Sequence, residues 1–238
     1  MNKGTLWYLK EPLDTSFAQA GGRSPDKRIV PALCARCGRG ARYVTPRPLI
    51  LEWEPGADVI GDFTWPGGGR VAVKRTVFDI LARKFSGFHA ENVEMVQDPK
   101  LKRPKRPASR SKPRIWLPYT GPELVELWPD CPVPFLPATT FEVAWRCEDC
   151  GNEPLQLSGI ELKMQRYDSD TGELVPDHHP RVPGKGVFVS ASAVGDHPIF
   201  RLTESAGTIL CTDEVKSFVL REGFTNVDFG EYGDVVEP

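Results

Sequence analysis

The hydrophobic pattern between residues 61 and 99 predicts a strand, a helix and a second strand. A short apolar run at 71–73 has the length of a buried strand. Residues 76–85 then carry apolar side chains three and four positions apart, which places them on one face of a helix. Gly87 follows, and glycine is favoured just after a helix ends. The segment 92–96 resumes a strand-like pattern, so we expect a strand-helix-strand unit here.

The same succession returns between residues 186 and 238. An apolar run at 208–210 precedes a helical pattern that starts at Thr212, a favoured N-cap, and stops at Gly223. A strand-like segment follows at 226–229. Both stretches contain a Gly-Asp dipeptide before the apolar run and a Gly-Phe pair after the helix, which predicts two units related by duplication. We expect the phenylalanines of both pairs to be buried, namely Phe88 and Phe224.

Four of the six cysteines form two copies of the pentapeptide Cys-x-x-Cys-Gly, and they are Cys34, Cys37, Cys147 and Cys150. Two such pairs supply the four thiolates of a structural tetrahedral Zn²⁺ site. We predict that these residues bind one structural zinc ion. Two redox dithiols or two separate disulfides are the alternatives, although a redox pair calls for a thioredoxin-like context that the flanking patterns do not show. The other cysteines, Cys131 and Cys211, are expected to be core or boundary residues.

The second cysteine pair lies between two strand-like runs, 139–146 and 155–164, as in a zinc-ribbon hairpin. We expect a second hairpin turn at 168–172 and a loop at 176–186. The predicted fold class is α+β, with two duplicated strand-helix-strand units flanking a zinc-ribbon-like β-hairpin with a four-cysteine site. The expected segments are an N-terminal segment with the first zinc knuckle (1–60), the first unit (61–99), a basic proline-rich connector (100–118), the ribbon region with the second knuckle (119–185) and the second unit (186–238).

The connector contains a basic arm, residues 100–114, with eight basic residues, three prolines and no acidic residue. The prolines exclude a helix or a central strand there. Clustered Lys and Arg side chains favour nucleic acid or an acidic protein surface as a partner. The alternative is an extended, solvated connector, which is favoured because the arm has no aromatic residues on which bases could stack. The acid-rich end of the chain, residues 222–238, is a candidate intramolecular counterpart.

Composition excludes several classes of protein. Hydrophobic residues make up 40% of the chain and charged residues 26%, which is ordinary for a globular protein. The formal net charge is −2, so no overall field attracts nucleic acid or a membrane surface. No apolar run approaches the roughly 20 residues of a membrane span, and the first residues lack the apolar core of a signal peptide. We therefore expect a cytoplasmic protein without a membrane partner.

The sequence contains no phosphate loop, dinucleotide fingerprint or nucleophile elbow. His178 and His179 are the strongest candidates for acid-base chemistry, but Pro176 and Pro180 predict an exposed turn around them. A zinc ion closed in by four cysteines has no open position for a substrate. We therefore predict a protein that is not an enzyme, has no catalytic residues and binds no cofactor besides structural zinc.

The two CxxCG copies are followed by Ile199-Phe200-Arg201-Leu202, a Thr-capped helix and Gly-Phe-Thr-Asn-Val-Asp-Phe at 223–229. In these features the chain resembles the double-CXXCG motif family, a paralogous family first noted in myxobacteria. The resemblance supports the four motif cysteines as a shared feature. It also implies an immunity protein, which neutralises a toxin delivered between neighbouring bacterial cells.

The expected partner is therefore a cognate toxin protein, bound by stoichiometric capture, and nucleic acid is the less favoured partner. A zinc-ribbon nucleic-acid-binding protein that uses the basic arm is the alternative function. The basic arm is one candidate for the toxin-contacting surface. The other is the acid-rich end, with Asp228, Glu231 and Asp234 beside Tyr232.

Overall fold

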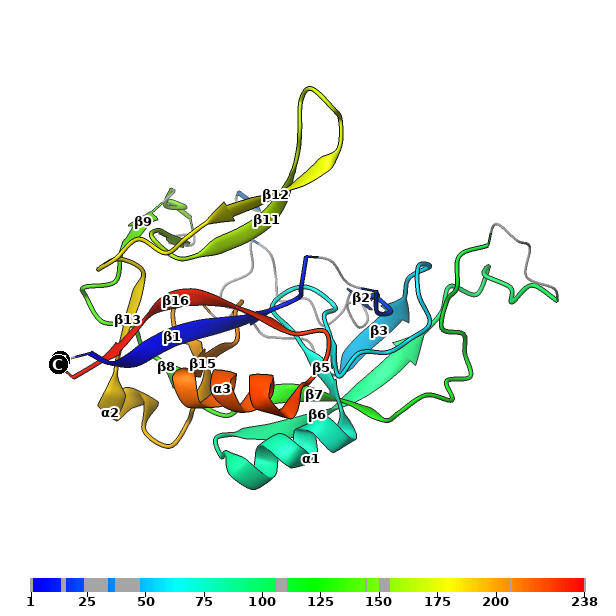
Figure 1. Cartoon of the computed structure of the whole chain (residues 1–238), viewed down its shortest axis with the longest axis horizontal. Helices are drawn as coiled ribbons and strands as arrows, with labels where there is room; N and C mark the ends of the chain where they lie inside the picture. Colours follow the sequence, from blue (N-terminus) through cyan, green and yellow to red (C-terminus); the bar gives the residue numbers. More distant parts are fainter. Residues whose placement is uncertain are drawn as a thin grey trace.

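The computed structural model describes residues 2–13, 16–23, 34–36, 48–105, 111–143, 145–149, 155–205 and 207–237. Of these residues, 39% lie in strands and 12% in three helices. The predicted α+β class is therefore wrong, because the fold is mostly β with curled sheets (Figure 1). Three strands run for nine residues each, and they extend well beyond the segments that the hydrophobic pattern indicated. They are β1 (Asn2–Lys10), β6 (Phe88–Val96) and β16 (Asp228–Val236).

The first six-stranded sheet is built from residues between 20 and 129. Its strand order is β2 (Ala20–Arg23), β3 (Leu49–Trp53), β6, β7 (Leu124–Pro129), β5 (Ala72–Lys74) and β4 (Phe63–Thr64). Strands β3 and β6 are parallel, and the other neighbours are antiparallel. Helix α1 (Arg75–Lys84) connects β5 to β6. These two strands lie on either side of β7 in the sheet.

The second six-stranded sheet combines the two ends of the chain. Its strand order is β13 (Val187–Ser190), β16, β1, β15 (Leu210–Thr212), β14 (Ile199–Leu202) and β8 (Pro132–Val133). A short helix, α2 (Ala191–Val194), follows β13. Helix α3 (Asp213–Glu222) connects β15 to β16, and β1 lies between these strands and is antiparallel to both.

The two sheets share one arrangement. In each, a helix joins two strands that flank an antiparallel third strand, and a parallel neighbour lies beyond the second of them, β3 beside β6 and β13 beside β16. The two sheets differ in where the central strand of this arrangement comes in the sequence. In the first sheet it is β7, which follows helix α1, and in the second it is β1, which precedes all the other strands of that sheet. The strand-helix-strand segments are thus integral parts of two large sheets, which is why they do not form separate units beside a ribbon.

Both long helices begin and end close to the predicted residues. Helix α1 buries Val77, Phe78 and Leu81, and α3 buries Val215, Phe218 and Val219. Thr212 is the N-cap of α3, and Gly223 ends this helix in the left-handed conformation with φ 69°. The end of α1 differs from the prediction, because Phe85 is its C-cap with extended backbone angles and Gly87 lies in the turn that follows.

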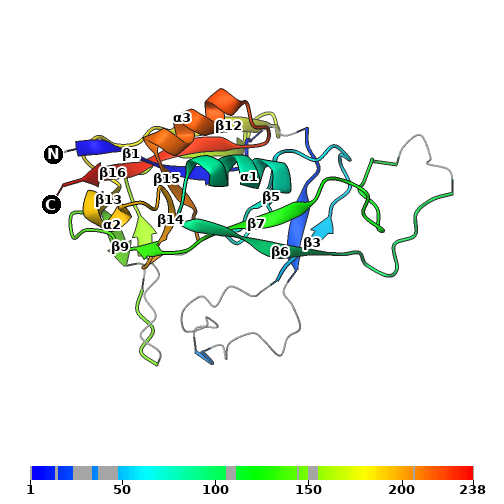
Figure 2. The same cartoon turned by 90° about the horizontal axis from the view of Figure 1, so that it is seen from below.

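The largest hydrophobic core joins the two sheets. Helices α1 and α3 lie side by side (Figure 2), and the rings of Phe85 and Phe218 meet edge to face with their centroids 5.3 Å apart. Phe88 is buried in this core, whereas Phe224 is only half-buried and packs against it. The expectation of burial is therefore met by Phe88 and only partly by Phe224.

A buried ion pair lies where the two sheets meet. The Arg70 guanidinium donates hydrogen bonds of 2.7 Å and 2.5 Å to the two carboxylate oxygens of Glu126 on β7. Glu126 is completely buried. On β14, the Arg201 guanidinium lies 5.6 Å from the ring centroid of Trp128, and burial lowers the pKa of Arg201 to about 10. The carboxylate thus neutralises positive charge at the junction, where an isolated ion is costly.

Two small antiparallel hairpins complete the described structure. Strands β9 (Phe141–Val143) and β10 (Leu155–Leu157) pair on either side of the second cysteine pair. Strands β11 (Leu162–Tyr167) and β12 (Leu174–His179) pair around the expected turn at 168–172. The predicted loop at 176–186 is wrong over its first four residues, which belong to β12. Pro176 is tolerated there because β12 is an edge strand of a two-stranded sheet.

Candidate metal centre and binding surface

The structure brings together the first cysteine of each CxxC pair. The Sγ atoms of Cys34 and Cys147 lie 3.8 Å apart, although 113 residues separate them in the chain. This distance is far longer than the roughly 2.05 Å bond of a disulfide, so these two sulfurs are not bonded to each other. Cys37 and Cys150, the second cysteine of each pair, lie outside the described residues.

The sulfur separation fits a zinc site. In a tetrahedron with metal-sulfur bonds of about 2.3 Å, two ligand sulfurs lie about 3.8 Å apart. Cys34 and Cys147 have this separation, and Cys147 is buried. These two residues would therefore hold one edge of the tetrahedron, and binding by Cys37 and Cys150 stays a prediction. Zinc bound in this way supplies a covalent link between distant segments and no reactive position.

Arg36, in the first CxxC motif, forms exposed ion pairs with the second motif. Its guanidinium lies 2.5 Å from the Glu148 carboxylate and 3.3 Å from the Asp149 carboxylate, and both acids belong to the second CxxC pair. An exposed pair of this kind contributes little stability, but it shows which segments face each other. Arg36 thus pairs with carboxylates that lie between the two cysteines of the second motif.

The two remaining cysteines are placed differently from each other. Cys211 on β15 is completely buried, and burial raises the pKa of its thiol. Cys131, which follows β7, is exposed, so the expectation of a core or boundary position is met by Cys211 alone. Neither residue lies in a CxxC pair, which makes Cys131 a suitable control for experiments on the motif.

The β11–β12 hairpin is attached to the body at its base. Lys163 Nζ donates a 2.8 Å hydrogen bond to the Phe229 carbonyl oxygen and lies 3.3 Å from the Asp228 carboxylate. The Glu161 carboxylate accepts a 2.7 Å hydrogen bond from the Glu231 backbone N–H. The Tyr8 hydroxyl donates to the Glu161 carbonyl oxygen, and burial raises the pKa of Tyr8 to about 12. These contacts hold the base of the hairpin against strand β16 and fix the direction in which the hairpin projects from the body.

The two histidines expected in an exposed turn lie instead on strand β12. His178 Nε2 is 2.7 Å from the Glu161 carboxylate, and His179 Nε2 is 3.2 Å from the Asp177 carboxylate. His178 therefore belongs to the contacts that hold the hairpin base. That neither histidine is catalytic stays a prediction.

The outer half of the hairpin carries apolar side chains into solvent. Tyr167 and Leu174 are direct cross-strand partners, and their exposed fractions are 73% and 52%. Side chains two residues apart on a strand share a face, so Tyr167 lies on the face of Lys163, the side that turns toward the body. Because the tip projects beyond the body (Figure 1), the described residues leave this apolar pair exposed.

The turn of the hairpin is acidic. Residues 167–174 contain Asp168, Asp170 and Glu173 and no basic residue. Backbone N–H groups of Thr171 and Asp170 donate to the Asp168 carboxylate, and these hydrogen bonds lower the pKa of Asp168. The hydrogen bonds order the turn, so the tip presents its negative charge in a defined position.

The described part of the basic arm is extended and exposed. Its exposed basic residues are Lys100, Lys102, Arg103, Lys105 and Lys112. The structure assigns none of these five an ion pair with a described residue. The acid-rich end of the chain is engaged elsewhere, because Asp228 pairs with Lys163, Asp234 with Arg181 and Glu237 with Lys3. The expected pairing between that end and the arm is therefore not formed in the described structure.

The acid-rich end is also a poor contact surface. Tyr232 is buried, with only 5% of its surface exposed, and its ring packs against Tyr8 with the centroids 5.4 Å apart. Asp234 is mostly buried beside Arg181, which donates to both carboxylate oxygens. Of the two contact surfaces suggested by the sequence, the described part of the basic arm is the accessible one.

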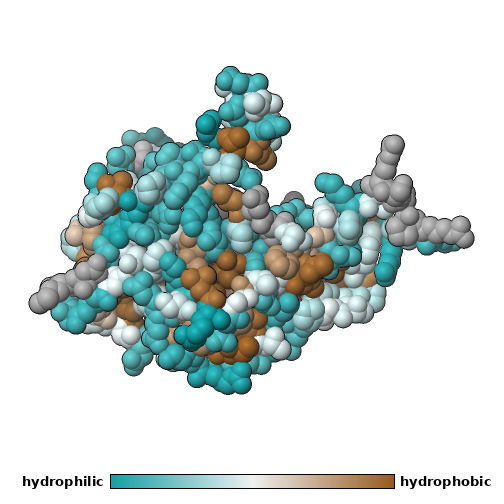
Figure 3. All heavy atoms as spheres, in the orientation of Figure 1, coloured by the Kyte–Doolittle hydropathy of each residue, from teal (hydrophilic) through white to brown (hydrophobic). Residues whose placement is uncertain are grey.

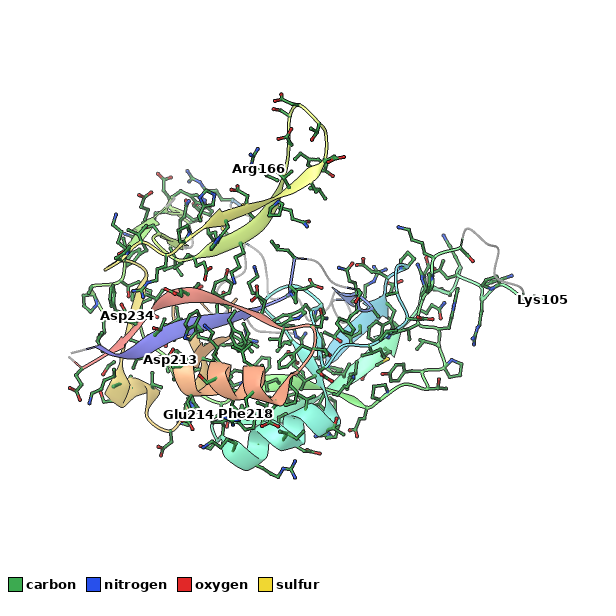
Figure 4. The ribbon with its side chains drawn as sticks, viewed as in Figure 1. Lys105, Arg166, Asp213, Glu214, Phe218 and Asp234 are labelled. Carbon is green, nitrogen blue, oxygen red and sulfur yellow. The ribbon has the colours of Figure 1, made fainter. Side chains whose placement is uncertain are left out.

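The hairpin tip and the described part of the basic arm project from the body on two sides of an open region (Figure 3), which we call the hollow. Arg166, on the hairpin, and Lys105, in the arm, lie on opposite sides of it (Figure 4). Near the arm, strands β2 and β3 and the arm residues Leu101 and Arg114 line a groove of about 350 Å³. The sequence indicated the arm and the turn, but it contained no signal that the hairpin would project.

No protein-family model matches the chain, and no curated protein matches its sequence closely. The family resemblance therefore rests on the motifs in the sequence. Among the described residues, no helix has the length and apolar character that a bilayer span requires.

Proposed function

We propose that this protein is an immunity protein that binds a cognate bacterial toxin in the cytoplasm and neutralises it by stoichiometric capture. The observation that carries the proposal is the projecting hairpin with its exposed cross-strand pair, Tyr167 and Leu174. The resemblance to the double-CXXCG motif family supplies the class of partner.

An exposed apolar pair at this place calls for a covering surface. A two-stranded hairpin alone is marginally stable in water, and large apolar side chains at its tip add no packing to the body. Contiguous exposed apolar groups commonly mark protein-protein contacts, and tyrosine is enriched among residues that dominate binding energy. The hairpin is therefore better suited to binding a protein than to supporting the fold.

The cysteine motif supports capture over chemical inactivation. A zinc ion bound by four cysteines is coordinatively closed, so it stabilises structure and offers no site for a substrate. The ion would link the segment around Cys34 to the β9–β10 hairpin, which contains Cys147. Strand β10 is followed in the chain by the projecting β11–β12 hairpin. In this proposal the metal stabilises the scaffold and the hairpin contacts the toxin.

Nucleic-acid binding through the basic arm is the second candidate function. The specific observation in its favour is the set of five exposed basic side chains without ion pairs to described residues. This candidate predicts binding that falls steeply with salt and is indifferent to the hairpin.

The test is to co-express the chain with the protein encoded by the adjacent gene and then to mix the purified pair. Capture predicts rescue of growth and a stable complex of one inhibitor per toxin. Rescue at catalytic amounts without a complex would contradict capture, and a lack of rescue would contradict the immunity function.

A further inference from the structure

Resting on the proposed function, we infer that the toxin binds across the hollow. It contacts the hairpin tip with a basic patch and covers Tyr167 and Leu174 with an apolar side chain. With an acidic patch it contacts the described arm residues Lys102, Arg103 and Lys105. The partner is thus a protein with a bipolar surface.

On the hairpin side of the hollow, the tip residues 167–174 supply negative charge and apolar area, next to the basic Arg166. Asp170 and Glu173 are exposed in the turn, next to the exposed pair on the strands. A partner covering the pair would bury an aromatic and an aliphatic side chain in the centre of a contact with a charged rim. This is the usual anatomy of a protein interface.

The arm side of the hollow supplies positive charge. Lys102, Arg103 and Lys105 follow one another in an extended segment that projects from the body (Figure 4). Because the acids at the end of the chain pair with Lys163, Arg181 and Lys3, they do not neutralise these residues. Charge of this kind attracts an acidic surface and raises the rate of encounter.

The two charges together favour a protein over nucleic acid. A nucleic acid carries negative charge along its whole backbone, so contact with the arm would bring phosphates toward the acidic tip on the other side of the hollow. A protein surface can present both signs at the required separation. A nucleic acid bound to the arm alone would leave Tyr167 and Leu174 exposed.

The experiment uses the full chain and the purified protein encoded by the adjacent gene. Three variants alter the hollow: Tyr167→Ser with Leu174→Ser, Asp170→Lys with Glu173→Lys, and Lys102→Glu with Arg103→Glu. Asp168 is left intact because it orders the turn. The matched control is Asp79→Lys with Arg83→Glu on the exposed face of α1, which lies on the opposite side of the body from the hairpin (Figure 1).

Calorimetry gives Kd, and stopped-flow mixing gives the association rate. The apolar double variant should raise Kd about 100-fold or more, since each of two anchor residues commonly contributes about tenfold or more. Each charge reversal should slow association about tenfold at low salt, with a smaller effect at high salt. The control should change neither quantity more than about threefold, and melting temperatures show whether each variant is folded.

The possible outcomes separate the inference from the proposed function. If the wild type binds the toxin and the hollow variants bind as the control does, the inference is wrong and the proposed function stands. If the wild type does not bind the toxin, both fall. Tight binding of a DNA or RNA duplex that depends on the arm alone, or self-association that depends on the tip and the arm, would also overturn the inference.

Discussion

The sulfur atoms of Cys34 and Cys147 lie 3.8 Å apart at the junction of two segments separated by 113 residues. Closing a loop of this length has a large entropic cost, and the described contacts between the two knuckles are exposed ion pairs of small energy. The predicted zinc ion, when bound, would hold the two segments together more strongly than those ion pairs do. The same metal would place the second knuckle, and hence the strands beyond it, against the N-terminal segment.

The first prediction is one zinc ion per chain. Cys147→Ser and Cys150→Ser should each lose the metal and lower the melting temperature sharply, because metal binding contributes directly to folding free energy. Metal analysis of the purified proteins and thermal unfolding check both effects. Cys131→Ser is the matched control, since this exposed cysteine lies outside the motif, and it should keep its zinc. Wild-type protein without stoichiometric zinc would remove the claim.

The second prediction concerns the buried Glu126. Glu126→Ala should destabilise the protein by about 3–5 kcal/mol, because it leaves the Arg70 charge buried without its carboxylate. Urea unfolding measures the loss. Glu123→Ala removes the partner of Arg75 in an exposed ion pair, so it should cost less than about 1 kcal/mol. Equal losses for the two variants would mean that the junction of the sheets does not depend on the buried pair.

The third prediction compares the two phenylalanines that follow Gly87 and Gly223. Phe88→Ala should cost roughly 3–5 kcal/mol as the deletion of a buried aromatic ring that meets Phe78 edge to face. Phe224→Ala should cost less, because its ring is only half-buried. Denaturant unfolding of both variants gives the order. A larger loss for Phe224→Ala would show that the two positions are not packed as described.

The fourth prediction is a pH dependence from His89. The hydrogen bond with Asp130, together with that to Glu91, raises the pKa of His89. A raised folded-state pKa means that the charged histidine stabilises the fold fully below its unfolded pKa of about 6.5 and loses this effect as pH rises through the folded value. The stability difference between wild type and His89→Gln should therefore shrink as pH rises above about 6.5. Asp130→Asn should flatten the same profile, and a constant difference across this range would count against the assignment.

Helical positions could be predicted because their pattern is local. Val77 and Leu81 repeat at the spacing of one helix face, and Thr212 and Gly223 mark the two ends of α3 with side-chain preferences that act over a few residues. The fold class could not be predicted in the same way. Strand β1 pairs with β16 at the other end of the chain, and nothing in the residues from Asn2 to Lys10 marks that partner. A local sequence pattern therefore predicts the helices well and underestimates the length of the strands.

The same distinction between local patterns and long-range contacts applies to the residues of the candidate site. The spacing of the cysteines predicts a shared zinc site, because metal geometry restricts the arrangement of its ligands. Cys34 and Cys147 lie at a separation that such a site allows, and zinc binding itself stays a prediction. By contrast, Tyr167 and Leu174 are ordinary strand residues in the sequence. Their exposure follows from the direction of the hairpin, which is set by contacts such as that between Lys163 and Asp228. Contacts of this kind join residues distant in sequence and leave no periodic signal.

The position of β1 between β15 and β16 also affects how the protein is made. During synthesis β1 leaves the ribosome before both strands that flank it, so it must remain without these partners until residues 210–236 have been translated. Most of the first sheet, from β4 to β7, comes from residues 63–129 and can assemble earlier. We therefore expect nascent chains to expose an unpaired β1 strand with Leu6 and Leu9, and to depend on chaperones until β16 is released.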